Sequence, residues 1–205
     1  MTKGIHWLLG LLGVGALCGA YGYGWERHQL EVVSLPVSLP DWPQALKGVR
    51  MVHFSDTHLG PYWGIEELRR VVDLINREKP DLICFTGDLV DKSTRLLSAA
   101  VPVLRALQAP LGKFAVLGNH DWRFGQQAVI HQALLDAEFQ VLNNRHVRLP
   151  LIGHLATPEL GQKYVSGLMQ AGERGMPVYT NRGLGTTILP VRFLCRPEVT
   201  VLTLV

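Results

Sequence analysis

Apolar residues occur along this chain in two different patterns. Residues 5–24 form one uninterrupted stretch of 20 positions without Asp, Glu, Lys or Arg. From residue 31 onward, short apolar runs alternate with segments in which apolar residues recur every three or four positions. The first pattern predicts a helix long enough to cross a bilayer, and the second predicts buried strands that alternate with amphipathic helices.

Run length, together with proline and glycine breaks, places the individual elements. Strands are predicted at residues 31–39, 49–54, 81–85, 113–117, 139–142 and 199–204, and helices at residues 65–79, 95–107 and 126–137. The helix at 65–79 is well defined, because its apolar residues share one face and Pro80 follows it. Asn143-Asn144 favours a turn after which residues 146–149 pair back as a hairpin.

This alternation predicts an α/β fold, with helices on the faces of the sheet. We expect a membrane anchor or signal-anchor at residues 1–25, a linker or extended arm at 26–47, and one domain at 48–205. In α/β sheets, ligands bind beyond the carboxyl ends of the strands. Polar residues at those ends are therefore the first candidates for a functional site.

Composition adds few constraints. Among the 205 residues, 47% are hydrophobic and 18% are charged, which is enough apolar material for a real core. The net charge of +3 does not point to nucleic acid. Residues 143–196 contain seven Lys or Arg against two Glu, which indicates a solvated basic surface or, alternatively, contact with an anionic substrate or lipid headgroups. The three cysteines imply neither a disulfide framework nor a zinc site.

The apolar N-terminal stretch has two interpretations, an uncleaved anchor or a cleaved signal peptide. Cys18-Gly19-Ala20 is a weak cleavage site, and Leu17 is too large for a lipoprotein signal. Tyr21, Tyr23 and Trp25 suit the interface at the far end of a spanning helix. We therefore favour an uncleaved anchor, whose orientation is not determined because one Lys precedes it and one Arg follows it.

Three short motifs place polar side chains just past the ends of predicted strands. They are Asp56-Thr57-His58, Gly87-Asp88-Leu89-Val90-Asp91 and Gly118-Asn119-His120-Asp121. Each alone is weak, since Asp-x-His is common, the aspartates could cap helices, and Gly-Asn-His-Asp could form a plain turn. Their order and their shared placement after apolar strands favour metal binding.

The residue types in these motifs suit a two-ion site for phosphate-ester hydrolysis. Asp56 and His58 can both turn toward one ion, and Asp88 can bridge two ions with its two oxygens. Asn119 offers an amide oxygen to the second ion. Carboxylate and imidazole ligands together suit Mn, Fe or Zn better than Ca.

His120 and Asp121 are the predicted catalytic pair. His120 is placed to donate a proton to the leaving oxygen or to hydrogen-bond a phosphoryl oxygen, and Asp121 could orient its imidazole. The expected nucleophile is a hydroxide held by two metal ions, which attacks phosphorus in line with the leaving group.

The motifs, within residues 54–60, 86–91 and 117–121, resemble those of the calcineurin-like metallophosphoesterases. The anchor and residues 163–168, 181–187 and 189–193 are similar to a bacterial membrane-associated phosphodiesterase branch. The resemblance implies a β-sandwich flanked by helices, anchored in the bacterial cell membrane. It also implies a phosphodiester or phosphomonoester substrate, with a lipid-linked phosphate as one candidate. In the family pattern, Asp56, His58 and Asp88 would bind one metal ion. By the same resemblance, Asp88 and Asn119 would hold the second ion, and His120 would assist the leaving group.

The chain departs from that family in one respect. The family uses a further histidine and then a Gly-His-x-His segment, and neither occurs here. An internal deletion near Leu149-Pro150 would account for their absence and would truncate the second half of the fold. Among the remaining histidines, packing or surface roles are favoured, with His131 and His146 the better candidates for substitute ligands.

The incomplete ligand set leaves alternatives open. One is a non-catalytic remnant that binds at most one ion. Another is a membrane-tethered interaction module that uses the basic residues between 143 and 196, which we call the basic tail. The sequence predicts neither a nucleic-acid partner nor an oligomeric state.

Overall fold

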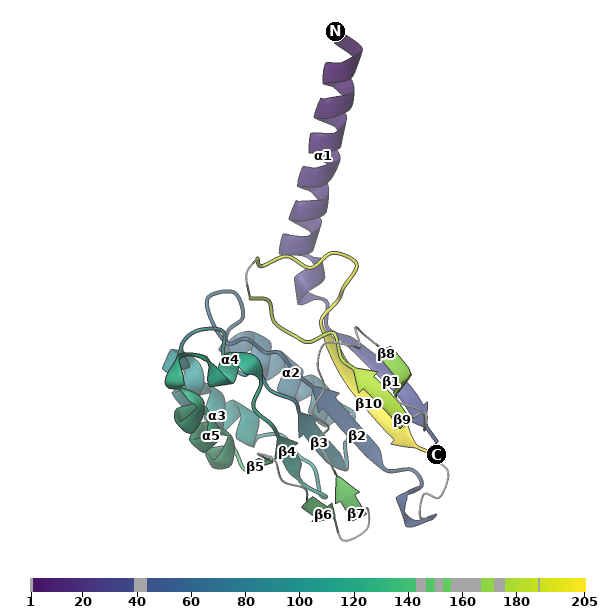
Figure 1. Ribbon diagram of the computed structural model, residues 1–205, viewed down its shortest axis with the longest axis vertical. Helices are drawn as coiled ribbons and strands as arrows, with labels where there is room; N and C mark the ends of the chain where they lie inside the picture. Colours follow the sequence, from purple (N-terminus) through teal and green to yellow (C-terminus); the bar gives the residue numbers. More distant parts are fainter. Residues whose placement is uncertain are drawn as a thin grey trace.

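The structure is a computed structural model that describes residues 2–38, 44–142, 147–149, 153–155, 167–171, 176–187 and 189–205. Asn143-Asn144, His146 and Pro150, which the sequence prediction singled out, lie outside the described residues. Helix α1 (Thr2–Gly24) stands clear of the rest of the chain (Figure 1). Its large apolar side chains are exposed, and the segment Ile5–His28 is long and apolar enough to cross a membrane.

The main sheet has six strands in the order β1-β10-β2-β3-β4-β5. Their bounds are β1 Glu31–Val37, β2 Arg50–Phe54, β3 Leu82–Phe85, β4 Lys113–Ala115, β5 Gln140–Val141 and β10 Glu198–Leu204. Strands β2 to β5 are mutually parallel, and only the β10–β2 pairing is antiparallel. The segment predicted as a linker or extended arm thus contributes β1, an edge strand of this sheet.

Helices α2 (Ile65–Arg77), α3 (Leu97–Arg105) and α5 (Gln127–Asp136) connect the parallel strands and flank the sheet (Figure 1). The predicted apolar face of α2 is buried, and its members are Leu68, Val71, Val72 and Ile75. Pro102 lies inside α3 without ending it. Short 3-10 turns are η1 Glu26–His28, η2 Gln44–Leu46, η3 Thr94–Leu96 and η4 Arg123–Gly125. The mixed α/β fold predicted from the sequence is therefore confirmed.

Aromatic side chains form the centre of the core between the sheet and the helices. The ring centroids of Phe54 and Phe85 are 4.9 Å apart, and Phe139 lies 6.4 Å from Phe85. Cys84 packs beside a second buried cluster, and burial raises the pKa of its thiol to about 12. All three cysteines are free, as the sequence indicated.

Two smaller antiparallel pairs lie outside the main sheet, β6 (Val147–Leu149) with β7 (Gly153–Leu155), and β8 (Gly167–Ala171) with β9 (Met176–Thr180). The sequence predicted that residues 146–149 pair back toward the preceding strand, but β6 pairs forward with β7. A three-residue connection makes the forward hairpin the more local pairing. Within the described residues, these two pairs contain all the strands that lie outside the six-stranded sheet.

Candidate metal centre

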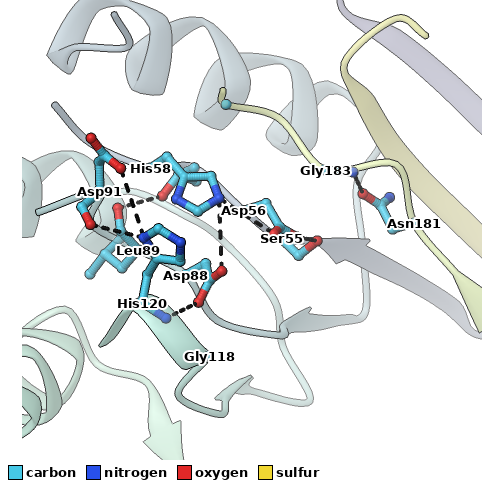
Figure 2. Close-up of polar contacts among 12 residues, drawn as sticks. Ser55, Asp56, His58, Asp88, Leu89, Asp91, Gly118, His120, Asn181 and Gly183 are labelled. Atoms are coloured by element: carbon cyan, nitrogen blue, oxygen red, sulfur yellow. Dashed lines mark hydrogen bonds and ion pairs between the residues drawn. The ribbon is translucent and has the colours of Figure 1, made fainter. Parts of the chain in front are cut away.

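Three loops meet at one edge of the sheet, because β2, β3 and β4 are parallel neighbours and end side by side. The loop after β2 carries Asp56 and His58, and the loop after β3 carries Asp88. Helix α4 (Asn119–Trp122) follows β4 and carries Asn119 and His120. Figure 2 shows the side chains of Asp56, His58, Asp88 and His120 gathered in one cluster.

Three of the predicted ligands have left-handed backbone conformations. The φ angles are 55° at Asp56, 44° at His58 and 56° at Asp88. Such conformations cost about 1–3 kcal/mol each for residues other than glycine and concentrate at functional sites. Hydrogen bonds between the loops hold them, with Asp56 N donating to Gly87 O at 2.9 Å and His58 N donating to Asp88 O at 3.0 Å.

The first ligand group consists of Asp56, His58 and Asp88. His58 Nε2 lies 3.6 Å from Asp56 Oδ1 and 3.8 Å from Asp88 Oδ2. One ligand atom from each residue falls within 4.8 Å of the other two, so one ion can contact all three. His58 and Asp88 are buried, whereas Asp56 is partly exposed. The structure therefore brings together the three residues that the sequence proposed for the first ion.

The electrostatics of the two carboxylates differ. Burial pushes the pKa of Asp56 upward, but hydrogen bonds from His58 and Ser55 outweigh burial, and the net shift is downward. Burial and the nearby charge of Asp56 raise the pKa of Asp88, against a hydrogen bond from the backbone of His120. A buried carboxylate whose charge is disfavoured by burial and by a neighbouring carboxylate is an environment in which a divalent cation is favourable.

A second group lies on the other side of His58 and consists of His58, Asp91 and His120. The rings of His58 and His120 are 4.7 Å apart, with Asp91 beside His120 (Figure 2). Two buried atoms of this group, His58 Nδ1 and Asp91 Oδ1, have no hydrogen-bond partner in the described structure. Unpartnered buried imidazole and carboxylate atoms fit a cation-binding role, because leaving them unpaired costs free energy. The residues present thus fit at least one divalent transition-metal ion.

The structure corrects the predicted role of Asp121. This carboxylate is fully buried and accepts hydrogen bonds from the backbone N–H groups of Asp88 at 2.8 Å and Leu89 at 2.8 Å. It also accepts from Val90 at 3.4 Å and Gly118 at 3.0 Å. Both oxygens are therefore occupied by backbone donors, and Asp121 holds the Asp88 loop instead of the His120 ring. Burial raises the pKa of Asp121, opposed by these hydrogen bonds.

Asp91 occupies the position that the sequence prediction gave to Asp121. His120 Nδ1 lies 2.9 Å from the backbone oxygen of Asp91 and 3.8 Å from its Oδ1. A carbonyl oxygen only accepts, so Nδ1 carries the proton, and Nε2 takes no part in this hydrogen bond. Sequence reasoning missed this contact, although the spacing Gly-Asp-x-x-Asp in residues 87–91 was the available signal.

Asn119 begins α4 and is exposed beside the cluster. Asp88 Oδ1, which would serve the second ion, already accepts the backbone N–H of His120 at 2.8 Å. The candidate substitute His131 lies in α5, outside both ligand groups. Among the described residues, the first ion position thus has three candidate ligands, Asp56, His58 and Asp88. The second ion position has two, Asp88 and Asn119.

A glycine-containing segment near the C-terminus supports the first ligand group. Leu184 N donates to Ser55 O at 3.1 Å, and Gly185 N donates to Asp56 O at 2.6 Å. Gly183 has a φ of 72°, and a Cβ at this position would lie 2.7 Å from the Cβ of Asp56. This segment was noted in the sequence for its resemblance to the family, but its direct packing against Asp56 was not predicted.

We expect Gly183→Ala to weaken metal binding by roughly 10- to 100-fold, the usual cost of disturbing a group that orients a ligand. The added methyl must displace Asp56, and an alanine at residue 183 is strained because φ is positive there. Gly125→Ala is the matched control, because Gly125 has a φ of 66° and open space around it. Calorimetric titration with Mn²⁺ measures both variants, and equal affinities would rule out the support role.

A cavity of about 480 Å³ borders the cluster at Asp56 and His58. Asp56 and His58 line one part of it, and Leu189, Val191 and Phe193 line another. It therefore combines polar groups that suit a phosphate ester with an apolar wall.

Two arginines of the basic tail have internal roles. Arg182 forms ion pairs with Glu198 at 2.5 Å and Glu31 at 2.7 Å. Arg192 is buried and donates to the backbone oxygen of Gly185 at 2.7 Å. Part of the tail's positive charge thus stabilises the loop beside the site instead of forming a solvated surface.

Comparison with known proteins matches residues 49–183 to the calcineurin-like phosphoesterase family. The metallophosphoesterase YkuE of Bacillus subtilis (strain 168) is 31% identical, covering 96% of this chain and 94% of the relative. A Danio rerio transmembrane protein with a metallophosphoesterase domain is 29% identical over 66% of this chain and 31% of its own length. The UDP-2,3-diacylglucosamine pyrophosphatase LpxG of Chlamydia trachomatis serovar D is 38% identical over 47% of this chain and 30% of the relative.

The length of one alignment bears on the missing ligands. The comparison with the Bacillus subtilis relative extends over 272 positions, whereas this chain has 205 residues, so at least 67 positions of the alignment (272 minus 205) lack a residue of this chain. Those positions have no counterpart in this chain, although both proteins are covered almost from end to end. The shortfall has a size that could accommodate the absent Gly-His-x-His segment, and its place near Leu149-Pro150 stays a prediction.

Proposed function

The chain belongs to the calcineurin-like phosphoesterase family, and we propose that it hydrolyses phosphodiester or phosphomonoester bonds with the help of divalent metal ions. The observation that carries this proposal is the convergence of Asp56, His58 and Asp88 within 4.8 Å at the carboxyl edge of the sheet. Family membership and this geometry both favour the same chemistry.

The proposed metal ligands are Asp56, His58 and Asp88 for one ion, and Asp88 with Asn119 for a second. A bound Mn, Fe or Zn ion would polarise the phosphoryl oxygen and activate water. Asp88 holds its Oδ2 toward His58 and its Oδ1 toward the backbone of His120. This double engagement fixes the carboxylate plane, so the ligand is positioned before any ion binds.

His120 is the proposed proton donor to the leaving oxygen. Its Nδ1 is anchored on Asp91, which leaves Nε2 available to the substrate. The Asp91 carboxylate lies 3.8 Å from the same Nδ1, so the side chain and the backbone of Asp91 both face the imidazole. Asp91 is therefore a positioning residue for His120, and Asp121 positions the loop that carries Asp88.

The proposed substrate is an amphiphile with a phosphate ester, such as a lipid-linked phosphate in the bacterial cell membrane. Helix α1 places the domain at a membrane if it spans one, and the cavity has an apolar wall. A relative named for a diacylglucosamine pyrophosphatase activity adds support. We propose no nucleic-acid partner.

Hydrolysis of bis-p-nitrophenyl phosphate by the full chain in detergent tests the proposal. We expect turnover that depends on added Mn²⁺, Fe²⁺ or Zn²⁺ and disappears with a chelator. Elemental analysis of the same sample gives the number of ions per chain. Absence of turnover at saturating metal would refute an esterase role for this polypeptide.

The sparse second ion position favours one alternative function, a non-catalytic remnant that binds a single ion. It predicts one ion per chain at most and no hydrolysis of either monoester or diester substrates. A stoichiometry near two ions with measurable turnover excludes it.

A further inference from the structure

The loop that connects the site to β10 is hydrogen-bonded to the C-terminal end of helix α1 and to the turn that follows it. We call residues 189–195 the apolar loop. Arg192 N donates to Gly22 O at 3.3 Å, and the N–H groups of Leu194 and Cys195 each donate to the carboxylate of Glu26 at 2.9 Å. Figure 1 shows this loop, in yellow, beside the lower end of α1.

The attachment is close and specific. Glu26 is buried, with 2% of its surface exposed, so the loop's two N–H groups satisfy a carboxylate that has little access to water. A Cβ at Gly22 would lie 2.5 Å from Arg192 O, so the helix needs glycine where the loop crosses it. The rings of Tyr21 and Phe193 meet edge to face at 6.5 Å. The loop and the end of α1 therefore form one unit.

The outer side of the apolar loop presents large hydrophobic side chains. Exposed fractions are 69% for Leu189, 49% for Phe193 and 83% for Leu194. Leu194 also has a φ of 54°, a left-handed conformation that a bulky residue rarely adopts. A clustered apolar surface supported by a strained backbone indicates a contact surface instead of a chance exposure.

We propose that the apolar loop inserts into the lipid bilayer interface next to the point where α1 leaves the membrane. Continuity with α1 identifies lipid as the occupant, because the loop is bonded to the end of the apolar helix. Tyr21, Tyr23 and Trp25 at that end are exposed aromatic residues of the kind that lie at headgroup depth. The apolar loop extends this aromatic zone sideways onto the domain.

This placement has a consequence for the substrate, which rests on the proposed function. Leu189, Val191 and Phe193 belong to the apolar loop and also line the cavity that borders Asp56 and His58. The cavity mouth thus lies at the membrane face of the domain. A phosphate ester at headgroup depth can enter it while its acyl chains remain in the bilayer.

Depth-dependent fluorescence quenching tests the insertion directly. The full chain carrying Cys18→Ser, Cys195→Ser and Leu194→Cys is labelled with an environment-sensitive fluorophore and reconstituted into phosphatidylethanolamine–phosphatidylglycerol vesicles. Val129→Cys on α5 is the control, because Val129 is 56% exposed and lies on a helix remote from α1 (Figure 1). Brominated acyl chains should quench the label at residue 194 several-fold more strongly than the label at 129. Equal quenching at the two positions overturns the proposal.

A kinetic comparison separates docking from catalysis. Leu194 does not line the cavity, so Leu194→Asp should leave hydrolysis of a soluble aryl phosphodiester within about twofold of wild type. Hydrolysis of a phosphodiester lipid in vesicles should show a KM increase of about tenfold, as expected when one leucine leaves an apolar environment. An equal effect on both substrates contradicts insertion. If the wild type hydrolyses neither substrate, the proposed function fails, while the quenching result still decides the membrane contact.

Discussion

Replacement of Asp88 by asparagine is expected to reduce metal-dependent hydrolysis by about a thousandfold or more, a loss of several kcal/mol of transition-state stabilisation. Asp88 lies between both candidate ion positions, with Oδ2 3.8 Å from His58 Nε2 and Oδ1 2.8 Å from the backbone N of His120. Asparagine keeps the shape and the acceptor but removes the charge. The steady-state rate with bis-p-nitrophenyl phosphate across a Mn²⁺ titration measures the effect.

The same substitution should leave the metal-free fold intact. Burial and Asp56 raise the pKa of Asp88, so its charge destabilises the metal-free protein, and the asparagine variant should melt at the same or a slightly higher temperature. Saturating Mn²⁺ should raise the wild-type Tm by roughly 5–10 °C and the variant's Tm hardly at all. Asp73→Asn, on the exposed face of α2, is the matched control and should behave as wild type. A metal-induced Tm increase that survives in Asp88→Asn would remove Asp88 from the ligand set.

Replacement of Asp121 by asparagine should lower stability by about 3 kcal/mol, because one of its two oxygens becomes an amide NH₂ that leaves two backbone N–H groups without an acceptor. The corresponding decrease in Tm is roughly 6–12 °C for a domain of this size. The reason is structural, since four backbone N–H groups converge on this fully buried carboxylate. Thermal unfolding of the metal-free protein, followed by circular dichroism, provides the measurement.

The control for Asp121→Asn is Asp136→Asn. The Asp136 carboxylate is exposed and accepts one hydrogen bond, from Gln132. It should change stability little. If Asp121→Asn kept full stability and instead altered the pH dependence of turnover, Asp121 would act on His120, as the sequence alone suggested. The structural role predicts the opposite, a large stability loss with the acid limb of the pH profile preserved.

The sequence was sufficient for the fold class and for the prediction that the three motifs meet at one edge of the sheet. Apolar runs ending at Phe54, Phe85 and Ala115 are strands because their side chains are buried on both faces, and such strands pair in parallel. Parallel pairing then brings the residues after each strand to one edge of the sheet. Local pattern and a general topological rule thus predicted that Asp56, Asp88 and Asn119 lie together.

The partners of individual side chains could not be read from the sequence. Asp121 is adjacent to His120 in the chain, but α4 turns its carboxylate inward onto the Asp88 loop, and Asp91 reaches the imidazole from another loop. Adjacent residues on a helical turn point in different directions, so sequence proximity did not predict contact. Only the tertiary structure decided which carboxylate serves which neighbour.

The sequence by itself determined an α/β chain of the phosphoesterase type, with an apolar N-terminal segment, three ligand motifs and no Gly-His-x-His segment, because each of these is encoded in local residue order. The tertiary structure decided that β1 joins the sheet, that Gly183 and Gly185 pack on the Asp56 loop, and that the apolar loop is bonded to Glu26 in the turn that follows α1. These contacts join segments more than a hundred residues apart. They depend on how the sheet orders its strands, and that order follows from packing of the whole domain, which no local pattern specifies.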